Sequence, residues 1–112
     1  MYTPTKTSQY EEMVRLSFLE QSKCFQPSNK YIRMVITANF AVPKSVSKKK
    51  REQMLNHEIL PDKKPDIDNI VKAILDGLNK TMYSDDKQIV ELTVKKQYGE
   101  TPCVVVEYEE IP

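Results

Sequence analysis

The stretch KPDIDNIVKAILDGLN, residues 64–79, decides the fold of this 112-residue chain. Its apolar residues recur at helical spacing and form one continuous stripe, which comprises Ile67, Ile70, Val71, Ile74, Leu75 and Leu78. This stripe predicts the strongest helix of the chain, with Asp68 as its N-cap and Asn79 at its end. Asp68 and Lys72 are four residues apart and therefore share a face opposite the stripe, which Asp76 continues one turn later. The helix should bury one side and present charge on the other.

The sequence on either side of this helix alternates between two further patterns. Helical spacing predicts two more helices, and alternation of apolar and polar residues predicts three strands. The predicted helices cover residues 9–21, after a capping box at Ser8-Gln9-Tyr10-Glu11, and 45–56; the predicted strands cover 31–40, 90–95 and 103–108. The turn between the last two strands predicts that they pair as an antiparallel hairpin. We therefore expect one α+β domain over residues 1–112, with a small mixed or antiparallel sheet packed against two main helices.

Composition is typical of a globular chain whose charges are unevenly distributed. It has 39% hydrophobic and 29% charged residues, no apolar run near the roughly 20 residues that cross a bilayer, and no signal peptide before Tyr2. We therefore expect a cytoplasmic protein with no membrane partner. Cys24 and Cys103 follow no metal-ligand spacing and are expected to be free thiols.

The basic residues gather in one part of the chain. Although the net charge is only +1, a dense group lies between residues 44 and 64, namely Lys44, Lys48, Lys49, Lys50, Arg51, Lys63 and Lys64. One interpretation is the solvated face of a helix. The other is a surface that contacts phosphate groups, and the acidic residues that follow favour it, because a metal-bound phosphate needs a basic approach.

Two pairs of carboxylates flank the helix predicted from residues 64–79. Asp66 and Asp68 stand where an extended linker enters it, and Asp85 and Asp86 follow it in a turn. Capping and the helix dipole explain the first pair but not the second, which should approach the same polar face. Like charges so close together are costly without a cation. Because Mg²⁺ prefers carboxylate oxygens and takes only one or two from a protein, the residues predict a divalent-cation site suited to phosphodiester chemistry.

Several segments along the chain carry a resemblance to a known family. They are residues 64–72 (KPDIDNIVK), 74–79 (ILDGLN), 83–90 (YSDDKQIV) and 95–99 (KKQYG), with 2–11 and 40–51 on the N-terminal side. Together they are similar to the RusA family of Holliday junction resolvases, in its prophage-type form. The resemblance implies a homodimeric, Mg²⁺-dependent endodeoxyribonuclease, with Mn²⁺ as a substitute, that cuts four-way branched DNA by paired incisions in recombination and repair.

The resemblance also assigns roles to residues. Asp66, Asp68 and Asp86 match the family's essential carboxylates, which would hold the metal, with the adjacent Asp85 as an optional further ligand. Lys72 matches its essential lysine and would stabilise charge that develops on phosphate oxygens. The basic residues of segment 44–64 would contact the DNA, namely Lys44, Lys48, Lys49, Lys50, Arg51, Lys63 and Lys64.

One departure from the family keeps other hypotheses open. Family members of this type usually begin with a further strand and a Pro- and Arg-rich loop, whereas this chain starts at Met1-Tyr2. A sheet edge should then lie uncovered and some DNA contacts should be missing. The leading hypothesis is a junction-resolving endonuclease, and the alternative is a DNA-binding or dimerisation remnant without turnover. A third hypothesis is a metal-dependent phosphohydrolase of small substrates.

Overall fold

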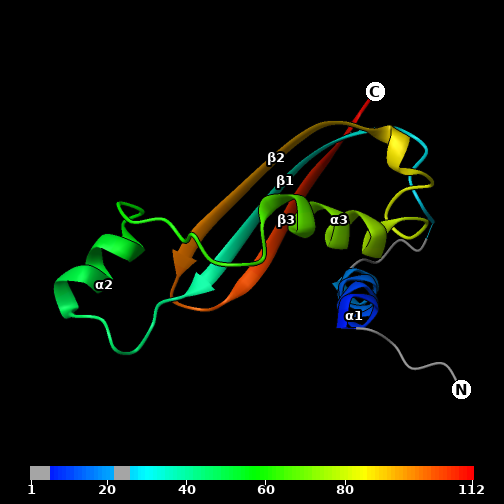
Figure 1. The fold of residues 1–112 in the computed structure, drawn as a ribbon. Coiled ribbons are helices and arrows are strands. Elements are labelled where there is room, and N and C mark those ends of the chain that lie inside the picture. Colours follow the sequence, from blue (N-terminus) through cyan, green and yellow to red (C-terminus); the bar gives the residue numbers. More distant parts are fainter. Residues whose placement is uncertain (1–5, 22–25) are drawn as a thin grey trace, which may run out of the picture.

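The computed structural model describes residues 6–21 and 26–112, and side chains from residue 11 onward in the first of these ranges. Figure 1 shows a three-stranded sheet with two helices on one face and a third helix beyond its end. The elements are α1 (Lys6–Gln21), β1 (Tyr31–Ala41), α2 (Lys48–Leu55), α3 (Ile67–Leu78), the 3₁₀ turn η1 (Asp86–Gln88), β2 (Ile89–Gly99) and β3 (Cys103–Ile111). This arrangement confirms the predicted α+β fold class.

β1 is the central strand of the sheet, in the order β2-β1-β3. It pairs in parallel with β2 and antiparallel with β3. Ile32, Met34 and Ile36 alternate along β1 and are 0% exposed, which is the burial that the alternating pattern predicted. In the described part of the chain, β2 and β3 have no strand on their outer edges.

The predicted hairpin of the last two strands is wrong, because β1 lies between β2 and β3. The short connection at residues 100–102 crosses the end of β1 instead of closing a tight turn. Two inter-strand spacings amount to about 10 Å, which these residues can bridge in an extended conformation. A short turn between two strands therefore does not by itself show that they pair.

α3 packs its apolar stripe against β1. Ile70, Ile74 and Leu78 are at most 5% exposed and belong to the same core cluster as the buried residues of β1. Ile67, which the sequence placed on the stripe, is 45% exposed. It is the first helical residue, and a helical side chain leans toward the N-terminus, so its side chain projects beyond the start of the helix.

The start of α3 differs from the prediction by two residues. Asp66, not Asp68, is the N-cap, with extended backbone angles of φ −73° and ψ 160°. The Asp66 carbonyl accepts the first helical hydrogen bond from the Ile70 N–H at 3.0 Å. Asp68 therefore lies within the first turn, where a carboxylate also complements the helix dipole.

α1 covers α3 and is seen end-on in Figure 1. The two helices approach closely at Gly77, where a Cβ atom would lie 2.9 Å from both the Glu11 carbonyl oxygen and the Val14 Cβ. Glycine is required at this position because a larger residue would force the helices apart. Phe18 of α1 packs edge-on against Tyr108 of β3, with ring centroids 6.4 Å apart, so α1 also contacts the sheet at β3.

The basic segment forms α2, on an arm that extends beyond the end of the sheet (Figure 1). The Ser47 hydroxyl caps this helix by accepting a hydrogen bond from the Lys50 N–H at 3.2 Å. Met54 is its buried residue, at 4% exposure. The Lys96 ammonium of β2 donates to the Lys63 carbonyl at 2.6 Å, which ties the linker after the arm to the sheet.

Three smaller predictions have separate outcomes. Cys103 is an exposed free thiol, as expected. Cys24 and the side chains of the capping box at Ser8 lie outside the described residues. In the ranges that the structure describes, no helix is long and apolar enough to cross a membrane.

Candidate functional site

Three of the predicted site residues lie in the first half of α3 or at its start. Asp66 is the N-cap, Asp68 lies in the first turn and Lys72 one turn further along, and all three side chains are exposed. The Asp66 side chain makes no capping hydrogen bond, so its carboxylate is not occupied in capping the helix. Asp68 and Lys72 are four residues apart and share one helix face, and Asp66 precedes them at the N-cap.

The second acidic pair lies beside the other end of α3. Asp86 Oδ1 accepts a hydrogen bond from the Tyr83 hydroxyl at 2.8 Å, and this hydroxyl lies 2.7 Å from the Leu75 carbonyl oxygen. Leu75 is in the last turn of α3, and its seven-residue separation from Asp68 corresponds to about 10 Å along the helix axis. The second pair therefore lies beside the C-terminal end of α3, away from Asp66 and Asp68.

The turn at residues 83–88 gives its two carboxylates different surroundings. Asp85 caps η1, because its Oδ1 accepts from the Lys87 N–H at 3.0 Å and its own N–H donates to Gln88 Oε1 at 2.8 Å. Asp86 takes no part in this capping box and instead meets the Tyr83 hydroxyl. Asp85 thus serves the turn, and the Asp86 carboxylate faces α3.

The predicted metal ligands are divided between the two ends of α3. Across residues 6–21 and 26–112, no group of three or more His, Cys, Asp or Glu side chains is placed to hold one ion. The pair Asp66 and Asp68 nevertheless suits Mg²⁺, because this ion takes one or two carboxylates and completes its shell with water and substrate phosphate. The donor chemistry therefore fits a divalent cation, while Asp86 stands apart from the first pair.

Tyr83 is a residue that sequence reasoning missed. It is 0% exposed and belongs to the core cluster. Burial raises the pKa of its hydroxyl far above the ordinary range, and the hydrogen bond and negative charge of Asp86 add to the shift, followed by the charges of Asp76 and Asp85. The hydroxyl therefore remains protonated and acts as a donor.

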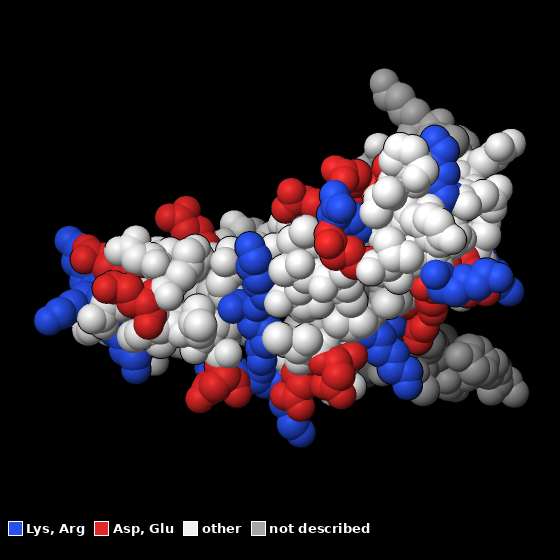
Figure 2. Space-filling model, turned by 90° about the horizontal axis from the view of Figure 1, so that it is seen from above, with Lys and Arg blue, Asp and Glu red and all other residues white. Residues whose placement is uncertain are grey.

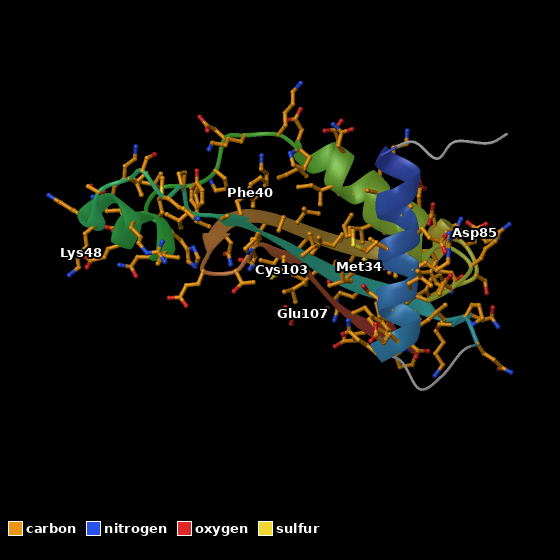
Figure 3. The ribbon with its side chains drawn as sticks, turned by 90° about the horizontal axis from the view of Figure 1, so that it is seen from below. Met34, Phe40, Lys48, Asp85, Cys103 and Glu107 are labelled. Carbon is orange, nitrogen blue, oxygen red and sulfur yellow. The ribbon has the colours of Figure 1, made fainter. Side chains whose placement is uncertain are left out.

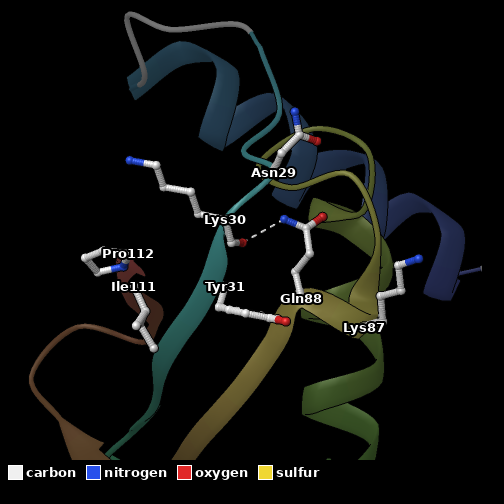
Figure 4. A pocket seen from close by; sticks show the side chains of 7 residues that line it. All are labelled: Asn29, Lys30, Tyr31, Lys87, Gln88, Ile111 and Pro112. Atoms are coloured by element: carbon white, nitrogen blue, oxygen red, sulfur yellow. Dashed lines mark hydrogen bonds between the residues drawn. The ribbon is translucent and has the colours of Figure 1, made fainter.

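Gln88 is a second residue that sequence reasoning missed. Its side chain is 7% exposed and donates to the carbonyl oxygens of Ser28 and Lys30 at 2.7 and 2.8 Å. Figure 4 shows the second of these bonds beside a hollow of about 580 Å³ near the start of β1. The spacing Asp85-x-x-Gln88 is that of a capping box and would have indicated the hydrogen bond that Gln88 Oε1 accepts from the Asp85 N–H. Nothing in the sequence indicates the bonds of Gln88 to Ser28 and Lys30 or the contact of Tyr83.

The free energy of unfolding should fall as pH rises above 10. In the unfolded chain Tyr83 loses its proton near the ordinary value of 10.0, whereas the folded chain keeps it. The folded state then binds more protons, so a stabilisation that is fully present below pH 10 is lost as pH rises toward the folded pKa. For one proton the slope is at most about 1.4 kcal/mol per pH unit.

Urea unfolding of the wild type and two variants between pH 8 and 11 measures this slope. Tyr83→Phe should flatten it, whereas Tyr31→Phe, which alters a side chain that is 60% exposed, should leave it as in the wild type. If the unfolding free energy of Tyr83→Phe fell with pH as steeply as that of the wild type, Tyr83 would not be the group that keeps its proton in the folded chain.

The predicted DNA-contacting residues are all exposed on the arm and the linker. They are Lys44, Lys48, Lys49, Lys50 and Arg51 before and within α2, and Lys63 and Lys64 before α3. On the face shown in Figure 2, basic side chains gather at the tip of α2 and in a band across the middle of the molecule, with acidic groups on both sides of the band. The linker joins this arm to the Asp66 end of α3, whereas Figure 3 places Lys48 and Asp85 at opposite ends of the molecule.

The comparisons with known proteins agree with the resemblance seen in the sequence. Residues 1–109 match the family model of endodeoxyribonuclease RusA. The chain is also similar to the uncharacterized protein YqaN of Bacillus subtilis (strain 168), with 47% identity over 72 residues that cover 62% of this chain and 51% of that protein. The chain thus spans about half the length of this curated relative. No solved structure matches it. Since the family match includes α3, both acidic pairs and nearly all of the sheet, the chain belongs to the RusA endodeoxyribonuclease family.

Proposed function

We propose that this protein is a Mg²⁺-dependent endonuclease that resolves four-way DNA junctions by paired incisions. The observation that carries the proposal is the family match over residues 1–109, which includes α3 with the exposed residues Asp66 at its N-cap and Asp68 and Lys72 on one face. Carboxylates and a nearby cation on one accessible surface suit a substrate that is a phosphodiester.

In this proposal the site residues have separate tasks. Asp66 and Asp68 would hold the cation, and Asp86 is the third proposed ligand, with Asp85 beside it. A bound Mg²⁺, or Mn²⁺ in its place, supplies a Lewis acid and lowers the pKa of an attacking water. Lys72 would contact the scissile phosphate and stabilise the negative charge that develops on its oxygens.

The separation of the two acidic pairs makes cation stoichiometry informative. Asp86 lies at the last turn of α3 and Asp66 and Asp68 lie at the first, so the two ends could serve one ion or two. Calorimetric titration with Mn²⁺ in the presence of junction DNA counts the ions per chain. Two ions would mean that each end of α3 holds its own. One ion, retained in Asp86→Asn, would mean that Asp66 and Asp68 hold it without Asp86.

The proposed substrate is four-way branched DNA and the proposed assembly is a homodimer. A four-way junction has near two-fold symmetry, so two copies related by a two-fold axis would present one site to each of two opposing strands. The basic residues of the arm and linker would contact phosphates, which position the junction without reading its sequence.

Lys49→Ala combined with Lys50→Ala should weaken junction binding and flatten its salt dependence. Each phosphate contact contributes about 0.9 to the slope of log K against log salt, so loss of two contacts should reduce the slope by about 1.8. Fluorescence anisotropy with labelled junction at several salt concentrations measures it. Lys30→Ala with Lys95→Ala removes the same charge from two other exposed lysines and should leave the slope unchanged. An unchanged slope in the first variant would make α2 an ordinary solvated surface.

The test of the proposed function compares a synthetic four-way junction with a linear duplex of equal length. Each is incubated with the protein in Mg²⁺ and in EDTA, and nicks are mapped on a denaturing gel. Symmetric, Mg²⁺-dependent nicks in the junction alone would support the proposal. Junction binding without nicks would favour the DNA-binding remnant, and cleavage of a chromogenic phosphodiester without preference for branched DNA would favour a small-substrate phosphohydrolase.

A further inference from the structure

The turn that carries Asp86 is fastened to the rest of the protein on two sides. On one side it joins the entry to β1, because the Ser28 N–H donates to the Met82 carbonyl at 2.9 Å and the Ser84 N–H donates to the Ser28 carbonyl at 3.2 Å. On the other side the buried ring of Tyr83 anchors it in the core beneath α3. The backbone around Asp86 therefore has little freedom, and the direction of its side chain depends on the contacts that it makes.

The Tyr83 hydroxyl has one proton and two acceptors within reach. They are Asp86 Oδ1 at 2.8 Å and the Leu75 carbonyl oxygen at 2.7 Å. The Leu75 carbonyl already accepts the helical hydrogen bond from the Asn79 N–H at 2.9 Å, so it is satisfied without the tyrosine. A bond to an ionised carboxylate is also stronger than one to a neutral carbonyl. The proton is therefore directed to Asp86 when that carboxylate carries its charge.

No second donor holds the Asp86 side chain within the part of the chain that the structure describes. Among the described residues, the orientation of this carboxylate thus depends on the Tyr83 hydroxyl.

We infer that Tyr83 is a positioning residue that orients the Asp86 carboxylate for a divalent cation and keeps a hydrogen-bond partner when the cation binds. The hydroxyl would hold Oδ1 of the carboxylate and leave Oδ2 for the cation, so that the same hydrogen bond persists when the ion is bound. Cation binding then leaves no polar group unsatisfied at this position. The inference rests on the proposed function in one respect, namely that Asp86 is a metal ligand.

Tyr83→Phe tests the inference, because it removes the hydroxyl and retains the buried ring. Loss of a hydrogen-bond partner to a metal ligand typically lowers metal affinity or activity about 10- to 100-fold. The dissociation constant for Mn²⁺, measured by electron paramagnetic resonance on the protein with junction DNA, should rise by that factor. Junction affinity should stay within about twofold, since Tyr83 is buried and the DNA-contacting residues lie elsewhere.

Two further variants separate positioning from general loss of stability. Tyr98→Phe removes the hydroxyl of another buried tyrosine, 4% exposed on β2, and should leave Mn²⁺ affinity unchanged. In an Asp86→Asn background, adding Tyr83→Phe should cause no further loss of Mn²⁺ affinity, because the group that it orients is already altered. An equal further loss in that background would overturn the inference, as would an unchanged Mn²⁺ affinity of Tyr83→Phe alone.

The inference and the proposed function can fail separately. Junction cleavage by the wild type decides the proposed function, whereas the ratio of Mn²⁺ affinities decides the role of Tyr83. A wild type that binds Mn²⁺ but does not cut, together with a weaker Tyr83→Phe, supports the inference and contradicts the resolvase. If the wild type cuts the junction in Mg²⁺, and Tyr83→Phe has the same Mn²⁺ affinity and cleavage rate as the wild type, the result supports the resolvase and contradicts the inference. A wild type that binds no Mn²⁺ overturns the inference, because Asp86 then has no cation to hold.

Discussion

Asp68→Asn should reduce Mg²⁺-dependent junction cleavage by at least about 100-fold, while junction binding stays intact or becomes tighter. The amide keeps the size of the carboxylate but loses the charge that a hard cation requires. Removing a group that only supports a ligand already costs about 10- to 100-fold, so loss of a proposed ligand should lie at or beyond the top of that range. Binding should not suffer, because one negative charge near the DNA is removed.

Single-turnover cleavage with excess protein measures the rate of Asp68→Asn, and anisotropy measures its affinity for the junction. Asp62→Asn is a matched control, since it makes the same change at an exposed carboxylate of the linker before α3. This control should cut at the wild-type rate. Equal losses of binding and cleavage in Asp68→Asn would argue against a catalytic role and leave Asp66 and Asp68 as residues that complement the dipole of α3.

Ile74→Ala should lower the free energy of unfolding by about 2–5 kcal/mol, because it leaves a cavity in the core. Ile74 is 1% exposed and packs in the cluster that joins α3 to β1. Such a loss is a large part of the roughly 5–15 kcal/mol that stabilises a typical domain. Since α3 carries Asp66, Asp68 and Lys72, cleavage should fail at a lower temperature than in the wild type and return on cooling.

Urea unfolding followed by circular dichroism measures the effect of Ile74→Ala. Ile67→Ala is the matched control, because it makes the same change in the same helix at a side chain that is 45% exposed. Its unfolding free energy should change by no more than about 0.5 kcal/mol, as for most surface substitutions. Comparable losses in the two variants would mean that α3 does not pack through the face that includes Ile74.

Much of the fold follows from local patterns that the sequence displays directly. The stripe of α3 and the alternation of β1 predicted both elements, because helical and strand periods place apolar residues on one face whatever the partner is. The first carboxylate pair and Lys72 were found in the same way, since helical spacing alone puts Asp68 and Lys72 on one face. The N-cap was misplaced because Asp66 and Asp68 have the same capping chemistry, and only the backbone angles distinguish them.

Strand order could not be predicted from the same patterns. The short turn before β3 is compatible both with a hairpin and with a crossing over the end of β1. The choice depends on which strand is buried most fully. Ile32, Met34 and Ile36 of β1 are 0% exposed, whereas Val90 and Leu92 of β2 are 55% and 36% exposed. The strand with the most burial lies in the centre, where it has a neighbour on each edge.

The candidate site shows the same division between what the sequence by itself determined and what only the tertiary structure decided. The residue types, the charged face of α3 and the family membership are properties of the sequence. Tertiary structure decided that Asp85 caps a turn, that Asp86 meets Tyr83, and that this contact lies at the last turn of α3. The physical reason is that helical and strand periods act between near neighbours, whereas the direction of a carboxylate depends on donors that chain folding brings to it.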